Sequence, residues 1–262
     1  MPTEAPLWAP PVLAVQFLTR LPVGSTASLS GEQVRDGLAR AVAWFPLVGA
    51  LVGCITAGVA IGSATVWPAI VAVILALAVE ARLTGAFHED AVADFADGFG
   101  GGQTGDDVRR IMKDSRIGTY GAVALILAMA LRAALMIELL TTRTPGVACF
   151  AIVGAATFGR WLIVAVMATT DPAPGAPGLA KDIGAGTGIR RLSLSTLAAV
   201  PGLAGFAVLE PIAVIAAVGA SLVFVVWLRR MLVRRIGGST GDCLGFAAYA
   251  GQLLFLLAAG AV

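Results

Sequence analysis

The chain has 262 residues, of which 58% are hydrophobic and 13% are charged, and its mean hydropathy is +0.89. Soluble domains carry about twice that share of charged residues, so the composition excludes an ordinary soluble globule and predicts an integral membrane protein. The net charge of +2 is too small to indicate a nucleic-acid partner, whereas membrane lipid is an expected partner of such a chain.

Seven segments are apolar and long enough to cross the hydrocarbon core of a bilayer, which takes about 20 helical residues. Because the first basic residue is Arg20 and the first span begins only at residue 42, we expect no cleavable signal peptide. The segments predict an all-α fold of about seven transmembrane helices in one polytopic membrane domain, residues 1–262. In chain order the spans are residues 42–62, 64–82, 118–140, 146–169, 192–209, 211–228 and 244–262.

Lysine and arginine are distributed unevenly between the two sides of this bundle. With the N-terminus on side one, that side receives all of the 18 basic residues except Arg143, on the opposite side, and Arg132 and Arg160, inside predicted spans. Positively charged loops stay in the cytoplasm. We therefore expect a cytoplasmic N-terminus, a C-terminus outside, and an active site on the cytoplasmic side.

Residues 87–98 concentrate acidic side chains in a chain that has few of them. On an α-helix at about 100° per residue, Asp90, Asp94 and Asp97 fall within an arc of roughly 60°. Three carboxylates so close would resist joint ionisation unless cations lie among them. The spacing therefore predicts a Mg²⁺ site, since Mg²⁺ prefers oxygen ligands.

Basic residues follow at a spacing that also suits a helix. Arg109, Lys113 and Arg116 are spaced i, i+4 and i+7 and share a face, while Asp114 lies off that face. Such a helix offers cations to a polyphosphate, and an acidic helix beside a basic one is what metal-assisted phosphoryl transfer needs. The alternative is that these residues only retain the loop in the cytoplasm.

Two Gly-rich hexapeptides, at 101–106 and 237–242, fall on the cytoplasmic face. Backbone N–H groups at a helix start bind phosphate, and Asp242 directly precedes the last span. Gly238, Thr240 and Asp242 are therefore candidates for substrate binding. The Pro- and Gly-rich segment 171–178 is either a lid or a flexible connector.

Charged and small residues inside the spans raise further alternatives. Arg160 costs on the order of 2.5–3.5 kcal/mol at mid-span, so it has either a functional role in a polar cavity or a structural ion pair, whereas Arg132 favours a structural role. The pattern Gly49-x-x-x-Gly53 allows close helix packing within the chain or between subunits of a homo-oligomer. The three cysteines, Cys54, Cys149 and Cys243, show no paired spacing and are interpreted as packing residues.

Five ordered blocks resemble the cobalamin synthase family, whose members are adenosylcobinamide-GDP ribazoletransferases. The similarity runs over essentially the whole chain. One departure is that the family usually has His-x-Asp-Gly where this chain has Ala91 in the last position, which leaves the carboxylates intact. The blocks are FLTRLP (17–22), FPLVG (45–49), FHED through ADG (87–98), MKDSRIGT (112–119) and GGSTGDCLG (237–245).

This resemblance implies a multi-pass enzyme of the inner membrane that requires Mg²⁺. It would join adenosylcobinamide-GDP to α-ribazole or its 5′-phosphate, giving adenosylcobalamin or its 5′-phosphate, and release GMP. Asp90, Asp94 and Asp97 would hold one or two Mg²⁺, and Asp114 would be a fourth ligand or the general base. His88 would orient substrate, act as the base, or cap the span. Substrate contacts are expected from Arg20, Glu89, Arg109, Lys113, Arg116, Arg160, Gly238, Thr240 and Asp242.

Three other classes of protein share some of these sequence features. A CDP-alcohol phosphotransferase would show Asp-x-x-Asp-Gly followed by Ala-Arg, and here Gly98 is followed by Phe-Gly-Gly. A membrane prenyltransferase also uses Mg²⁺ on a diphosphate, but it releases pyrophosphate rather than GMP. A transporter would place charges along a mid-membrane path and show internal symmetry, whereas these acids lie in one cytoplasmic loop.

Overall fold

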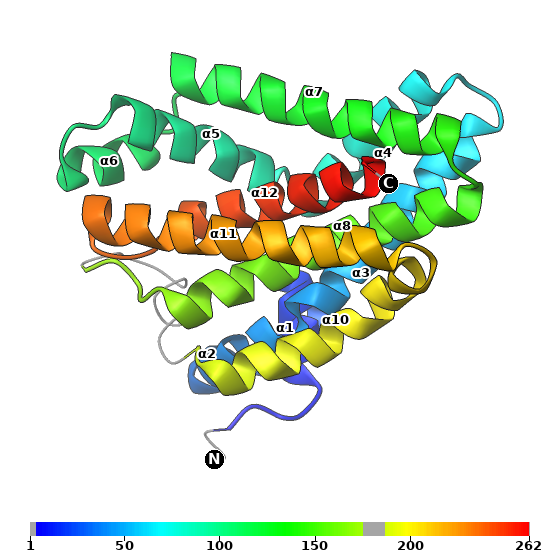
Figure 1. Cartoon of the computed structure of the whole chain (residues 1–262). Helices are drawn as coiled ribbons and strands as arrows, with labels where there is room; N and C mark the ends of the chain where they lie inside the picture. The colour runs from blue at the N-terminus through cyan, green and yellow to red at the C-terminus, as the bar shows by residue number, and fades with distance from the viewer. Residues whose placement is uncertain (1–3, 175–186, 262) are drawn as a thin grey trace.

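The computed structural model describes residues 4–174 and 187–261, and its regular structure in these ranges is helical apart from one isolated bridge between Pro172 and Ser239. Residues 175–178, half of the Pro- and Gly-rich segment predicted as a lid or connector, lie outside the described residues. Figure 1 shows the helices in chain order. They are α1 (Ala9–Leu18), η1 (Gly24–Ser28), α2 (Gly31–Ala41), η2 (Val42–Trp44), α3 (Phe45–Ala64), α4 (Ala69–Thr84), α5 (Phe87–Gly101), α6 (Gly105–Met112), α7 (Thr119–Thr142), α8 (Pro145–Thr169), α10 (Ile189–Leu209), α11 (Pro211–Ile236) and α12 (Gly241–Gly260).

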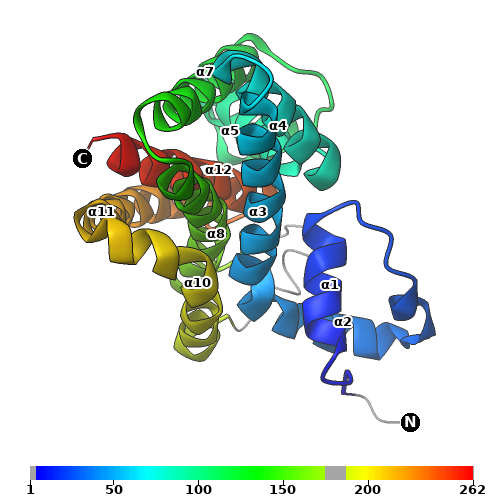
Figure 2. The same cartoon turned by 90° about the vertical axis from the view of Figure 1, so that its right-hand side faces the viewer.

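Six long apolar helices match the all-α membrane fold expected from composition. They are the unit Gly31–Ala64, which joins α2 to α3, together with α7, α8, α10, α11 and α12. α8 is the central helix, with 78% of its most apolar stretch buried, and α3, α10 and α12 pack around it. α1 and α2 lie together beside the start of α3, on one flank of the bundle (Figure 2).

The predicted span over residues 64–82 requires correction. The chain turns after α3, and α4 has 16 residues, about 24 Å of helix, which is too short to cross a bilayer core alone. α4 and α5 together pass as one span, but they are bent by 87° relative to each other. Among the described residues, six helices are thus long and apolar enough to span a membrane, and α4 with α5 makes a seventh span if the bent pair crosses as one.

The corner between α4 and α5 depends on two consecutive residues in the left-handed backbone region. Gly85 has φ of 74° and Ala86 has φ of 56°, and the N–H of Ala86 donates to the carbonyl of Ala81. A Cβ at Gly85 would overlap with the guanidinium of Arg20. The backbone N–H of Arg20 also donates to the carbonyl of Leu83 at 2.7 Å, so the segment after α1 fastens this corner.

Side chains tie the loops together at the end of the bundle where α6 lies. Arg109 donates to the carbonyl of Ile236 at 3.0 Å, and Arg235 donates to the carbonyl of Gly102 at 2.7 Å. These bonds connect the start of α6 to the end of α11 although more than 100 residues separate them in sequence. We call this the basic end; it comprises α6 and the turns at residues 113–118, 170–174 and 237–240.

The opposite end of the bundle is formed by the short turns between α7 and α8 and between α10 and α11. One ion pair joins these turns, Arg143 to Glu210 at 3.6 Å. Both side chains are partly exposed, so the pair contributes little to stability. The pair shows that the two turns lie at the same end of the bundle, as expected when successive helices run antiparallel.

Small residues bring α3 and α8 into close contact. A Cβ at Gly49 would overlap with the carbonyl oxygen of Ala156, and one at Gly53 would press on the backbone of Val153. The Gly49-x-x-x-Gly53 pattern is therefore used within the chain rather than between subunits. The three cysteines are free; Cys243 is buried and Cys149 is partly buried, which fits their interpretation as packing residues, but Cys54 is exposed, so that interpretation is wrong for Cys54.

A buried ion pair crosses the bundle between α4 and α7. Arg132 lies 2.7 Å from Glu80, and both side chains are less than 5% exposed. Arg132 also lies 3.7 Å from Glu89 and over the ring of Tyr249. Thr56 donates a further hydrogen bond to Glu80 at 2.8 Å. Arg132 thus has the structural role that was expected, and its ion-pair partners lie on helices other than its own.

Replacing Arg132 with leucine tests this pair. Removing one partner of a buried ion pair leaves an uncompensated charge and costs about 3–5 kcal/mol, so we expect a clearly lower midpoint of thermal unfolding in detergent. Glu138→Gln is the matched control, since Glu138 is exposed on the same helix. The double variant Glu80→Leu/Arg132→Leu should recover part of the loss. An Arg132→Leu protein that unfolds with the wild type would contradict the assignment.

Candidate functional site

Acidic side chains from two distant helices gather at the basic end. Asp90 and Asp94 lie one turn apart on α5, and Asp242 lies in the first turn of α12, which packs against α5. Asp94 is repelled electrostatically by Asp90, Asp242 and Asp97. Asp90 is exposed, whereas Asp94 and Asp242 are half-buried. We call Asp90, Asp94 and Asp242 the acidic trio.

Asp97 lies near the trio, but its carboxylate has a different set of partners. One oxygen accepts the N–H of Gly118 at 2.7 Å and the other accepts the N–H of Gly121 at 2.8 Å. Asp97 is 9% exposed and satisfies donors at the start of α7, which lack intrahelical partners. The prediction that Asp90, Asp94 and Asp97 point the same way is therefore incomplete, because Asp97 is committed to α7 while Asp242 joins the other two.

The donor chemistry of the trio suits a hard cation. Carboxylate oxygens are the ligands that Mg²⁺ prefers, and Mg²⁺ is usually held by one or two carboxylates, waters and substrate phosphates rather than by a complete protein cage. Within residues 4–174 and 187–261, no three His, Cys, Asp or Glu side chains converge closely enough to hold a metal by themselves. A cation here would need ligands from the substrate or water as well.

The basic segment after α6 differs from the long helix that its spacing predicted. α6 ends at Met112, and Lys113 is its C-cap, so Arg109, Lys113 and Arg116 do not share one helical face. Arg109 pairs with Asp106 and bonds to α11. Lys113 is exposed and attracts Asp242 electrostatically. Of the three predicted cations, Lys113 is the one that acts on the acidic trio.

Asp114 forms a local ion pair in the turn after α6. Its carboxylate accepts two hydrogen bonds from the Arg116 side chain, at 3.0 and 2.7 Å, and one from the Arg116 backbone N–H. The side-chain bonds are the largest cause that lowers the pKa of Asp114 to about 2. A carboxylate of such low proton affinity is a poor general base at neutral pH. Of its two predicted roles, metal ligand and general base, the second is therefore disfavoured, and in the structure Asp114 is engaged by Arg116.

The first residues of α5 lie deeper in the bundle than the trio. His88 is 2% exposed, its Nε2 has no partner among the described residues, and it is close to Arg160 and Arg132. Glu89 contacts Arg132 rather than the trio. The structure therefore places His88 beside the two buried arginines rather than among the carboxylates of the trio.

Arg160 shares this deep region. Its side chain is 1% exposed, and its Nη1 reaches the carbonyl of Ala156 at a long 3.4 Å. Its Nε has no partner in the described part of the chain, and neither does the amide of the buried Gln252. Glu80 and Glu89 attract Arg160 electrostatically, so the two arginines and two glutamates of this region balance in charge.

The second Gly-rich hexapeptide forms the turn from α11 into α12. Gly237 ends α11 with φ of 78°, and Thr240 caps α12 by accepting the N–H of Cys243. Ser239 exchanges backbone hydrogen bonds with the chain at Asp171 and Ala173. Gly238 is buried against this strand-like contact. The turn therefore places the N-terminus of α12, with Asp242, next to the acids of α5.

Three phenylalanines form a cluster that the sequence analysis did not single out. Phe17 stacks on Phe45 and meets Phe87 edge-on, with ring centroids 5.7 and 5.9 Å apart. The three rings line a small cavity together with Gly241 and Leu244 of α12. A signal was available, because each phenylalanine is the first residue of a block that carries the family resemblance. Arg20, in the first of these blocks, lies over Gly85 at the α4–α5 corner.

Comparison with known proteins identifies the family. The family model described as cobalamin-5-phosphate synthase matches residues 11–260. The chain belongs to the cobalamin-5-phosphate synthase family. It is similar to proteins named adenosylcobinamide-GDP ribazoletransferase from Ralstonia nicotianae (40% identity, 93% of this chain and 92% of the relative), Vibrio cholerae (37%, 94% and 91%) and Sinorhizobium medicae (35%, 91% and 90%). No solved structure matches the chain.

Alanine substitutions test whether Asp97 has a structural role that Asp94 of the trio lacks. Asp97→Ala leaves the N–H groups of Gly118 and Gly121 unsatisfied, which should cost about 1–3 kcal/mol and lower the unfolding midpoint in the absence of Mg²⁺. Asp94→Ala removes a mutually repelling charge, so its midpoint should equal or exceed that of the wild type. The measurement is thermal unfolding in detergent with a chelator; equal loss in both variants would contradict the distinction.

Proposed function

We propose that this protein is an adenosylcobinamide-GDP ribazoletransferase, which joins adenosylcobinamide-GDP to α-ribazole or its 5′-phosphate and releases GMP. The family match over residues 11–260 and the names of relatives at 35–40% identity support this reaction. The acidic trio, where α5 and α12 meet, is the observation that supports a particular location for the active site. The product would be adenosylcobalamin or its 5′-phosphate, in the assembly of the cobalamin nucleotide loop.

In the proposed reaction a ribose hydroxyl of α-ribazole attacks the phosphorus that carries the cobinamide arm. One phosphorus–oxygen bond forms, the P–O–P linkage breaks, GMP leaves with the electron pair, and the hydroxyl proton passes to a base. When bound, Mg²⁺ would neutralise charge on the diphosphate and the leaving phosphate. The residues that would hold it are Asp90, Asp94 and Asp242. Their mutual repulsion without a cation supports this assignment.

The remaining groups at the basic end would position the anionic substrate. Lys113 is exposed next to Asp242, and the N-terminus of α12 offers backbone N–H groups of the kind that bind phosphate. Asp97 would fix the start of α7 and thereby the turn that carries Lys113. The buried region around the start of α5 contains His88, Glu89 and Arg160. These residues would hold the start of α5 in place. Gly238 and Thr240 form the turn before α12, and this turn would contact the substrate.

We further propose that the protein lies in the inner cell membrane with its basic end in the cytoplasm. Positively charged loops favour that side, and the substrates are charged molecules that the bilayer would exclude. The N-terminus would then be cytoplasmic and the C-terminus outside, because α12 runs away from the basic end. The enzyme would work among membrane lipids, and the internal use of Gly49 and Gly53 removes one reason to expect a homo-oligomer.

Direct assay of the purified protein tests this function. In detergent with Mg²⁺, adenosylcobinamide-GDP and α-ribazole, we expect GMP and adenosylcobalamin to appear in equal amounts, measured by chromatography. EDTA should stop the reaction and added Mg²⁺ should restore it. Pyrophosphate release would instead indicate a prenyltransferase. Uptake of a labelled solute by sealed vesicles, with no GMP formed, would indicate a transporter and overturn the proposal.

Amide variants of the trio test the cation assignment separately. Asp94→Asn keeps the shape of the side chain but removes a charge that would hold Mg²⁺. Since a bound cation contributes several kcal/mol to the transition state, turnover should fall at least about 100-fold without loss of thermal stability. Asp242→Asn should mainly raise the Mg²⁺ concentration needed for half-maximal rate. Glu138→Gln is the matched control and should retain full activity; an Asp94→Asn enzyme as active as this control would refute the assignment.

A further inference from the structure

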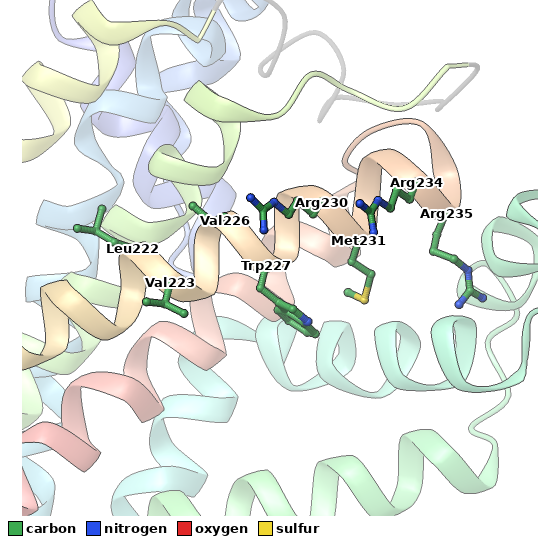
Figure 3. Close-up of a pocket in the computed structure, with 8 residues that line it drawn as sticks. All are labelled: Leu222, Val223, Val226, Trp227, Arg230, Met231, Arg234 and Arg235. Atoms are coloured by element: carbon green, nitrogen blue, oxygen red, sulfur yellow. The ribbon is translucent and has the colours of Figure 1, made fainter.

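A groove runs along the outer face of α11 near the basic end. Its volume is about 690 Å³, and α11 alone provides the residues that line it. Figure 3 shows two neighbouring rows of these side chains on α11, one with Arg230 and Arg234 and the other with Trp227 and Met231, which border the same groove. Nothing in the proposed reaction uses this surface.

The groove is apolar along most of its length and cationic at one end. Leu222 and Val226 continue the line of Arg230 and Arg234 at intervals of four residues, so all four occupy one stripe of the helix. Leu222 is 60% exposed, and Val226 and Trp227 are each 49% exposed. Large exposed apolar side chains on a long span face lipid rather than water.

The length of α11 places the cationic end at the depth of lipid headgroups. α11 has 26 residues, about 39 Å of helix, whereas the hydrocarbon core of a bilayer is about 30 Å thick. The excess at the basic end amounts to about two turns. Arg230 and Arg234 fall within those turns, while Leu222 and Val226 remain in the hydrocarbon region.

Two of the four arginines in this stretch of α11 have no ion-pair or hydrogen-bond partner within residues 4–174 and 187–261. Arg229 donates to the carbonyl of Thr169, and Arg235 donates to the carbonyl of Gly102. Arg230 and Arg234 are exposed and form no ion pair or hydrogen bond with the rest of the described chain. Their guanidinium groups are therefore available to an external anion.

We infer that this groove is a binding site for an anionic glycerophospholipid of the inner leaflet. The lipid phosphate would accept charge-assisted hydrogen bonds from Arg230 and Arg234. An acyl chain would lie along Leu222 and Val226, beside the Trp227 ring, whose amphipathic character suits this depth. Both halves of the lipid are matched by one continuous surface.

Two other occupants, a second copy of this chain and a soluble phosphate, fit this groove less well. A second copy of this chain would share the same orientation in the membrane, so a two-fold contact through α11 would bring Arg230 and Arg234 close to their own counterparts. A soluble phosphate would use the two arginines but not the apolar part of the groove. Only a lipid that is both anionic and apolar uses the whole surface.

Native mass spectrometry of the full-length protein in a neutral detergent tests the inference. The probes are dioleoyl phosphatidylglycerol and dioleoyl phosphatidylcholine, which share acyl chains and differ in charge. At about fivefold per arginine, the wild type should retain phosphatidylglycerol at a concentration about 25-fold lower than phosphatidylcholine. Arg230→Gln/Arg234→Gln should lose this preference, and rising salt should reduce it in the wild type.

The matched control removes the same charge elsewhere. Arg35→Gln/Arg190→Gln replaces two exposed arginines of α2 and α10 and should keep the full preference. Trp227→Ala should weaken retention of both lipids by a similar factor, which a purely ionic site would not show. Thermal unfolding of each variant verifies its fold.

Four results would overturn the inference. The first is equal retention of the two lipids by the wild type. The second is an unchanged preference in Arg230→Gln/Arg234→Gln. The third is a dimer mass that is lost in this variant while lipid retention is unaffected, which would assign the face to a second copy of the chain. Inorganic phosphate that displaces phosphatidylglycerol at equal concentration would likewise exclude a lipid-specific site.

Discussion

The position of the acidic helix depends on Arg132. This side chain lies in the middle of an apolar span, where its charge is expensive, and it is compensated by carboxylates on both sides of the α4–α5 corner. Glu80 belongs to the last turns of α4, and Glu89 to the first turn of α5. A charge that must contact both acids fixes the angle between the two helices, because any straightening would move one carboxylate away.

Depth along α5 then separates two kinds of polar group. α5 and α12 run antiparallel in contact, so that Ala91 packs on Gly245 and Asp94 lies near Asp242. Ala91, the position where this chain departs from the family pattern, is therefore accommodated at a helix crossing. Toward the middle of the bundle the charges are balanced between arginine and glutamate. Toward the basic end the same helix presents carboxylates that repel one another.

The sequence predicted the membrane fold well because span length and hydropathy are local properties. It also placed Asp90 and Asp94 on one helix, as the structure confirms. It did not predict where α6 ends, since an Asp114 carboxylate that bonds the N–H two residues later competes with the helix, and periodicity alone extends through that point. The broken second span was missed for a similar reason, because a window of hydropathy does not detect the 87° bend at Gly85 and Ala86 between α4 and α5.

Pairings between distant segments could not be predicted from spacing. The donors that occupy Asp97 come from the start of α7, more than 20 residues later in the chain, and Asp242 reaches the acids of α5 from a helix near the C-terminus. The position of a residue along a helix predicts the direction of its side chain, but tertiary packing determines which group that side chain contacts.

The same packing explains why Asp94 and Asp97 differ although they are three residues apart on one helix. Asp97 faces backbone N–H groups that neutralise its charge, and the hydrogen bonds hold the start of α7 against α5. Asp94 faces Asp90 and Asp242, with Lys113 as the nearby cation. Three carboxylates against one ammonium leave a local excess of negative charge, at the end of the bundle where an anionic substrate would arrive. Such a surface repels a diphosphate unless a cation arrives with it, so in the proposed reaction the substrate and Mg²⁺ would bind to the trio together.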